Sequence, residues 1–395
     1  MREIFLRGRS LLRSIASLPA LIFLGFVILA VIQLAAASWD PELPDTLRKI
    51  DLTDLDTIRT TLAAVITGVF TLTIFAYTMV MNVLDRSISS YSPRLLPLIL
   101  AERYHQEILG VGAGTIAHST ILLLGVAEPP DAAEPPPLAA ASAGFFAVVS
   151  LILFIYFIHR VSRSIHINAL LYKSFCHTRG CLQEIVKPSY RLYWSEDPSD
   201  TDGDYVVTER CGYLEEIDLH GLAKEASVVE IVARPGSFLY AGDKVLRYRE
   251  ERADRVGRYK DYFRISENEP IDVYVIGFRH LVEVAIKAAS PALNDPATSL
   301  TAMHYLVQLF EDLAAIGRHN AIGQEGRPEE LRLNTWTPEE LIHDLYRELR
   351  RYLENDPWGR AAIRKGLQRI ESAFAAGNDE RAVAAARTEA GLLGE

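Results

Sequence analysis

Four long apolar segments occupy the first 160 residues of the chain, and no comparable segment follows them. A helix needs about 20 apolar residues to cross the hydrocarbon core of a bilayer. We therefore expect a membrane protein with a four-helix transmembrane N-terminal half, followed by an α+β cytoplasmic domain made of a small β-module and then helices. The expected spans are Leu18–Ala37, Leu62–Leu84, Ile108–Val126 and Leu138–Ile158.

The first span also has features of a secretory signal. Arginines precede it, and the small-residue run Ala35–Ser38 follows it, as at a cleavage site. Its apolar stretch is longer than the usual core of a signal peptide, so we favour an uncleaved span.

The charges of the loops predict the orientation of the four spans. Arginines precede the first span, and Arg86, Arg94 and Arg103 lie between the second and third. The other two loops, Ser38–Asp56 and Glu128–Pro137, are acidic. Because basic loops stay on the cytoplasmic side, we expect a multi-pass protein of the cell inner membrane with both termini and the large tail in the cytoplasm.

Composition excludes several classes of function. The formal net charge is −10, and the acidic excess lies in the tail, so nothing resembles the basic stripe of a nucleic-acid-binding protein. The three cysteines are an odd number, which argues against a disulfide framework. They also lack the paired spacing of a zinc site, so we expect no metal and no cofactor.

The second span carries a stripe of small and polar residues at three-, four- and seven-residue steps, which places them on one helix face. Two interpretations are open. The hydroxyls can bond the carbonyl one turn back and serve packing between helices. Alternatively, several copies surround an axis and the stripe replaces part of an ion's hydration shell, which requires a homo-oligomer. The stripe is Thr60, Ala64, Thr67, Thr71, Thr78 and Asn82.

Three further features of the membrane half bear on helix packing or on polar contacts. Gly110 and Gly114 form a small-xxx-small pair that allows close approach of helices. His118 lies in the middle of the third span, where it either bonds a neighbouring helix as a neutral imidazole or serves a proton or ion path. Arg94, in the polar segment before the third span, is either solvated or a contact for lipid phosphate or an acidic partner.

The tail divides into three predicted pieces after the transmembrane domain of residues 1–164. Residues 165–204 look like a helical stalk and linker ending in an acidic, turn-rich stretch. Residues 205–250 have β-branched runs and glycine turns typical of a small β-barrel-like module. Residues 251–395 are mainly helical in period.

One turn in the tail has a clear structural meaning. Asp295 before Pro296 predicts a helix start, with a carboxylate to cap the free amides and proline at the first helical position. A membrane-tethered hydrolase with metal ligands among His280, Glu283, Asp295 and His304 is conceivable, but no second tight spacing supports it. We therefore expect no enzyme.

Two stretches carry a family resemblance. Tyr91–Arg94 and the longer stretch from Gly277 to Pro296 resemble a bacterial family of predicted membrane proteins of unknown function, the domain-of-unknown-function family twenty-two fifty-four. The resemblance covers roughly residues 60–310, with Ala292 where glycine is expected. It implies four N-terminal spans and a cytoplasmic domain, and it offers no catalytic residues. The motif positions are Arg94, Ser290, Pro291, Asn294, Asp295 and Pro296.

The leading functional expectation is a homo-oligomeric ion channel whose second span lines the pore, with the bilayer and ions as its partners. The alternative is a non-conducting scaffold or sensor whose tail binds a partner or a ligand. Oligomer size, the ion and the gating signal are left open by the sequence.

Overall fold

The computed structural model describes most of the chain in two compact units. The described residues are 17–36, 55–90, 103–126, 138–164, 167–186, 191–196, 203–222, 228–249, 256–323 and 331–393. Arg94, most of the first acidic loop and all of the second lie outside them, so the orientation of the spans stays a prediction. The first unit is the membrane half and the second is almost entirely the tail.

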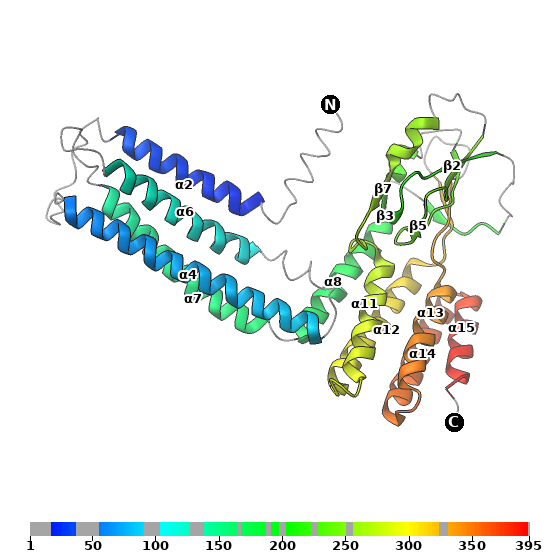
Figure 1. Cartoon of the computed structure of the whole chain (residues 1–395). Helices are drawn as coiled ribbons and strands as arrows, with labels where there is room; N and C mark the ends of the chain where they lie inside the picture. Colours follow the sequence, from blue (N-terminus) through cyan, green and yellow to red (C-terminus); the bar gives the residue numbers. More distant parts are fainter. Residues whose placement is uncertain are drawn as a thin grey trace. The chain divides into compact units, whose positions relative to one another are not determined.

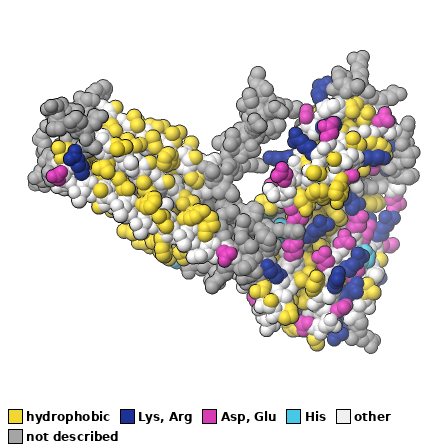
Figure 2. Space-filling model, in the orientation of Figure 1, with side chains coloured by type: hydrophobic (Ala, Val, Ile, Leu, Met, Phe, Trp, Pro, Cys, Tyr) yellow, Lys and Arg dark blue, Asp and Glu magenta, His cyan; other side chains and the backbone are white. Residues whose placement is uncertain are grey.

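Four helices make up the first unit (Figure 1): α2 (Ser17–Ala36), α4 (Leu55–Ser90), α6 (Arg103–Val126) and α7 (Leu138–Ser164). Each contains a stretch long and apolar enough to cross a membrane. Figure 2 shows hydrophobic side chains over most of the visible surface of this unit. The four predicted spans are thereby confirmed.

Helix α4 is much longer than its apolar stretch. The stretch suited to the membrane is Leu55–Asn82, but the helix continues through the polar residues that follow and ends at Ser90. The sequence predicts a helix end in the segment from Asp85 to Pro97. The described part of that segment is still helical, because charged and serine residues are tolerated in a helix outside the membrane.

Glycines allow α6 to pack closely against its neighbours. A Cβ atom on Gly114 would lie 2.6 Å from the Phe26 ring of α2, and one on Gly112 would lie 2.5 Å from Thr73 Oγ1 of α4. Gly110 likewise faces α2, at Ile22. The Gly110/Gly114 pair therefore serves helix packing, as the small-xxx-small spacing predicts.

The described tail residues of the second unit begin with α8 (Ile167–Ile185) and form two β-sheets. The larger sheet has the order β1-β8-β9-β4-β6-β2, and only its β4–β9 pair is parallel. The smaller sheet has the order β5-β3-β7. The strands are β1 (Arg191–Tyr193), β2 (Asp204–Val207), β3 (Gly212–Ile217), β4 (Val228–Ile231), β5 (Phe238–Leu239), β6 (Lys244–Tyr248), β7 (Phe263–Ser266), β8 (Ala321–Gly323) and β9 (Leu331–Leu333).

These sheets correct the predicted division of the tail. Residues 205–250 supply only part of the strands, because β1 precedes the predicted boundary and β7, β8 and β9 follow the module. Residues 165–204 are no free stalk either, since Leu171 and Leu182 of α8 are completely buried. The added strands are three or four residues long, too short for alternation to mark them in the sequence.

The remaining helices confirm the α+β organisation. They are the short α9 (Leu219–Leu222), the 3₁₀ turn η2 (Gly257–Tyr262), and α11 (Tyr274–Ala289), α12 (Pro296–Ile316), α13 (Pro338–Leu353), α14 (Pro357–Ala376) and α15 (Glu380–Gly391). Asp295 caps α12, with Oδ1 accepting from the Thr298 amide at 3.1 Å, as predicted. Figure 1 shows α11–α15 side by side at one end of this unit and the strands at the other.

Candidate functional site

The polar stripe of α4 lies on the outside of the single chain. Thr60, Thr67, Thr71, Thr78 and Asn82 are all exposed. Each of the four threonine hydroxyls donates to the carbonyl four residues earlier, at 2.7 to 2.9 Å. That arrangement keeps the hydroxyls satisfied and leaves their oxygen lone pairs facing outward.

The opposite face of α4 makes the contacts within the chain. Its buried residues are Ile58, Leu62, Val69 and Ala76. Each lies two positions from a stripe threonine, which is about 200° around a helix with 3.6 residues per turn. Among the described residues, the stripe therefore lies on the face of α4 that points away from its packing contacts.

Some polar side chains between the helices, in contrast, contact one another. His118 of α6 is completely buried, and its Nε2 lies 3.2 Å from Ser142 Oγ of α7. Ser142 in turn lies 3.3 Å from Gln33 Oε1 of α2. Phe26 and Phe146 pack edge-on against the His118 ring. The structure thus places His118 in a contact between helices, and its role stays a prediction.

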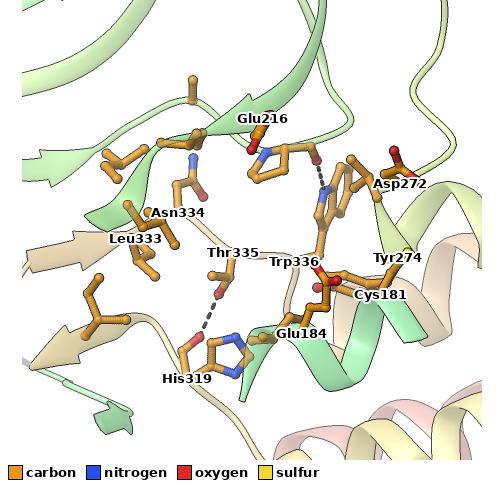
Figure 3. A pocket seen from close by; sticks show the side chains of 18 of the residues that line it. Cys181, Glu184, Glu216, Asp272, Tyr274, His319, Leu333, Asn334, Thr335 and Trp336 are labelled. Carbon is orange, nitrogen blue, oxygen red and sulfur yellow. Dashed lines mark hydrogen bonds between the residues drawn. The ribbon is translucent and has the colours of Figure 1, made fainter. Parts of the chain in front are cut away.

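The second unit contains a cavity of about 530 Å³, within the size range of small-molecule sites. Its walls come from α8, β3, β4, β8, the start of α11 and the segment from Leu333 to Trp336 (Figure 3). Most of the lining is apolar, and the polar side chains are mainly carboxylates. The carboxylates are Glu184, Glu215, Glu216, Asp218 and Asp272.

Trp336 forms a fixed aromatic wall of this cavity. Its indole Nε1–H donates to the Pro235 carbonyl at 3.2 Å, a bond drawn in Figure 3. The guanidinium groups of Arg234 and Arg279 lie 4.9 and 5.0 Å from the ring centroid. Neither arginine lines the cavity, and Arg234 is also paired with Glu340 at 3.1 Å.

A histidine and a cysteine meet at the edge of the cavity. His177 Nε2 lies 3.3 Å from Asp272 Oδ1, 3.0 Å from the Ile271 carbonyl and 3.9 Å from Cys181 Sγ. The Asp272 carboxylate, with Cys181, raises the pKa of His177 to about 10. All three partners approach the same ring nitrogen. A nucleophilic triad needs the acid and the nucleophile on different nitrogens, so this group is an ion pair rather than a catalytic relay.

This ion pair gives the tail a pH dependence. Folded His177 keeps its proton to about pH 10, whereas the unfolded side chain loses it near 6.5. Its contribution is therefore complete below pH 6.5 and disappears as the pH rises through about 10. The melting temperature of the tail, followed by tryptophan fluorescence on the full chain, should fall over this range. Asp272→Asn should flatten the profile.

A matched histidine distinguishes this ion pair from a general effect of pH. His304 is exposed on α12, so His304→Gln should leave the profile unchanged. If Asp272→Asn and His304→Gln give the same profile as the unmodified chain, the pair contributes nothing to folding.

The other tail residues considered as metal ligands are placed in separate local settings. His280 is buried and lies 4.0 Å from Glu269, while His304 is exposed and Asp295 caps a helix. Within the ranges that the structure describes, no three His, Cys, Asp or Glu side chains are placed to hold a metal ion. Asn294 precedes the cap in a left-handed conformation, with φ of 46°, which asparagine tolerates.

Sequence patterns do not reveal the cavity. Its carboxylates come from three separate stretches of the chain, and only the run Glu215–Asp218 is a local concentration of acids. No spacing rule links that run to Glu184 or to Asp272, which the fold brings to the same cavity.

Comparisons with known proteins place the chain in a family. Its residues 13–368 match the family described as "Predicted membrane protein (DUF2254)". Uncharacterised proteins of Mycobacterium bovis and Mycobacterium tuberculosis are 27% identical to it over 321 residues, 76% of this chain. The chain spans 60% of the length of those curated relatives. No solved structure matches it. The four membrane helices, the α+β tail and this match over most of the sequence establish that the chain belongs to this family of predicted membrane proteins.

Proposed function

We propose that the protein is a homo-oligomeric ion channel of the cell inner membrane, without enzymatic activity, in which α4 of each copy faces a shared path. The observation that carries the proposal is the outward threonine stripe, on the face of α4 opposite its contacts within the chain. A path for ions has to be lined by polar groups, and this line of hydroxyls is available between copies.

The chemistry of the stripe suits passage rather than tight binding. Because the threonine hydrogens are held by the helix's own carbonyls, the hydroxyl oxygens are free to accept from water or to face a cation. Oxygen dipoles replace part of a hydration shell without the strong attraction of a fixed charge, which would trap the ion. The predicted acidic outer loops would concentrate cations at the entrance.

The interior of a single bundle is a poorer route. Its polar side chains are bonded across helices, as His118 is to Ser142, and aromatic rings fill the surrounding space. The hollow between α4, α6 and α7, beside Thr73 and Gly112, has a volume of only about 10 Å³, roughly that of one water-sized probe. This favours a path between copies over one through a copy.

Flux measurements test the proposal. The full chain in liposomes should carry K⁺, measured with an entrapped indicator. The double substitution Thr71→Leu with Thr78→Leu should abolish that flux, because it removes two hydroxyl groups of each copy from the lining of the shared path. Thr71→Ser with Thr78→Ser retains the hydroxyls and should retain flux. Absence of flux in the unmodified chain, or equal flux in the leucine variant, would refute a channel lined by α4.

A matched position controls for general damage to α4. Phe70 is exposed on the same helix but about 100° from Thr71, so Phe70→Leu should leave flux and oligomer mass unchanged. Loss of flux in this variant too would mean that any change of the exposed surface disrupts assembly, and the assignment of the stripe would fall.

A second function, a non-conducting sensor, is favoured by the cavity of the tail. A cavity of about 530 Å³ with apolar walls and a few polar groups is typical of ligand sites. The mass of the purified particle separates the two functions. A monomer or dimer cannot enclose a path with one α4 per copy, so that result would favour the sensor.

A further inference from the structure

We propose that the cavity in the tail binds a small organic cation, a ligand with an apolar or aromatic body and one positively charged nitrogen. This goes beyond conduction and is independent of it, because the cavity lies entirely within the second unit. Shape, wall chemistry and charge each contribute to the assignment.

The walls suit an apolar body. Ile217 ends β3 and Leu219 begins α9, while Ile231 ends β4 and Ala233 follows it. Trp336 adds a flat aromatic surface, which its hydrogen bond to the Pro235 carbonyl holds in place. Burying an apolar body against such walls stabilises a complex because it removes apolar surface from water. A bare metal ion or an inorganic anion would gain nothing from this surface.

The charge of the lining selects a cation. Among the residues that the structure describes, five carboxylates line the cavity and no lysine or arginine does. His319 also lines it, and burial lowers the pKa of its ring, so the imidazole is neutral near pH 7. An anionic ligand would be repelled by these carboxylates, whereas a cation gains attraction in a space partly shielded from water.

Three of the five carboxylates pair with cations outside the cavity. Arg264 lies 3.4 Å from Glu215 and 3.2 Å from Glu216, and the His177 imidazolium pairs with Asp272. The guanidinium groups of Arg234 and Arg279 lie beside Trp336, but Arg234 is paired with Glu340, so the described acids around the cavity still outnumber the cations. Asp218 accepts a hydrogen bond from the Gly221 amide at 2.9 Å. Glu184 makes no hydrogen bond or ion pair with other described residues and is free to meet a ligand's nitrogen.

His319 adds a neutral acceptor to the same cavity. Its Nδ1 lies 3.1 Å from the Gly317 carbonyl, which can only accept, so Nδ1 carries the ring proton. Nε2 is then left with a lone pair. Thr335 holds the backbone of His319 through a 2.6 Å bond to its carbonyl (Figure 3). The cavity lining therefore includes a neutral imidazole acceptor as well as carboxylates.

Calorimetry with a defined pair of probes tests the assignment. The full chain in phosphatidylcholine nanodiscs is titrated with 1-methylquinolinium, and empty nanodiscs give the background. Saturable binding is expected, and quinoline, the uncharged analogue at neutral pH, should bind about tenfold more weakly because it lacks the charge interaction. Naphthoate, of similar size and opposite charge, should not bind.

Variants locate the binding. Glu184→Gln keeps the shape and should weaken 1-methylquinolinium about threefold, the scale for one accessible charge pair. Glu348→Gln, on an exposed part of α13, should change nothing. Ala233→Phe should fill the cavity and remove binding, and Glu184→Gln provides the test if that variant does not fold.

Three results would overturn the assignment: no saturable binding, equal affinity for the charged and uncharged probes, or equal loss in Glu184→Gln and Glu348→Gln. Because this measurement needs no flux, its failure would leave the channel proposal untouched, and a non-conducting chain would leave the cavity assignment untouched.

Discussion

Replacing Arg318 by methionine should lower the free energy of unfolding of the tail by about 3 kcal/mol, the cost of removing one partner from a buried ion-pair network. Arg318 donates two hydrogen bonds to Glu339 and two to Asp379, at 2.6 to 3.2 Å. Asp379 is only 10% exposed. The Arg318 guanidinium also lies over the Trp194 ring, 4.7 Å from the ring centroid. The substitution leaves two poorly solvated carboxylates without their cation.

Urea denaturation of the full chain measures this loss. Trp194, Trp336 and Trp358 lie in the second unit, so three of the four tryptophans report on its unfolding. Arg381, 64% exposed and 4.0 Å from Glu196, provides the matched arginine. Arg381→Met should cost less than about 1 kcal/mol, as exposed pairs do. An equal cost for the two substitutions would mean that the Arg318 network does not hold α12, α13 and α15 together.

Gly277→Ala should destabilise the same unit by about 1–3 kcal/mol through overpacking. An added Cβ would lie 1.9 Å from Thr178 Oγ1 and 2.6 Å from its Cγ2. Thr178 is buried, and its hydroxyl is committed to the Ser174 carbonyl at 2.8 Å, so it cannot swing away cheaply. Helices α8 and α11 would have to separate.

Helix α8 itself provides the control. Nothing lies within 4 Å of a Cβ added to Gly180, so Gly180→Ala should be neutral or stabilise the helix by up to about 1 kcal/mol. Adding Thr178→Ala to Gly277→Ala removes the two closest atoms and should recover part of the loss. If the double variant is no more stable than Gly277→Ala, the α8–α11 contact is not the cause.

The membrane half was predictable because its physical signal is strong. A bilayer demands long apolar runs, and α2, α4, α6 and α7 each contain one. Glycine spacing in the third span predicted close packing, which Gly110 and Gly114 make against α2. Asp295 and Pro296 likewise predicted a helix start, since capping is a local property.

Long-range pairing in the tail was not predictable from local patterns. Strand β4 pairs in parallel with β9, about 100 residues further along the chain, and each strand is only three or four residues long. Arg234 shows the same limit, because it reaches Asn334 and Glu340 across a similar separation. The cavity depends on these contacts, so its lining was invisible to periodicity and spacing.

Helix α4 has a mechanical consequence. At 1.5 Å per residue its 36 residues extend about 54 Å, well beyond a hydrocarbon core about 30 Å thick. From Val69, near the middle of the apolar stretch, the helix continues without interruption for about 32 Å to Ser90. A tilt of about 10°, the kind of adjustment a span makes to a thinner bilayer, displaces that end by about 5 Å. Such a tilt would convert a change in bilayer thickness into lateral movement of the end of the helix.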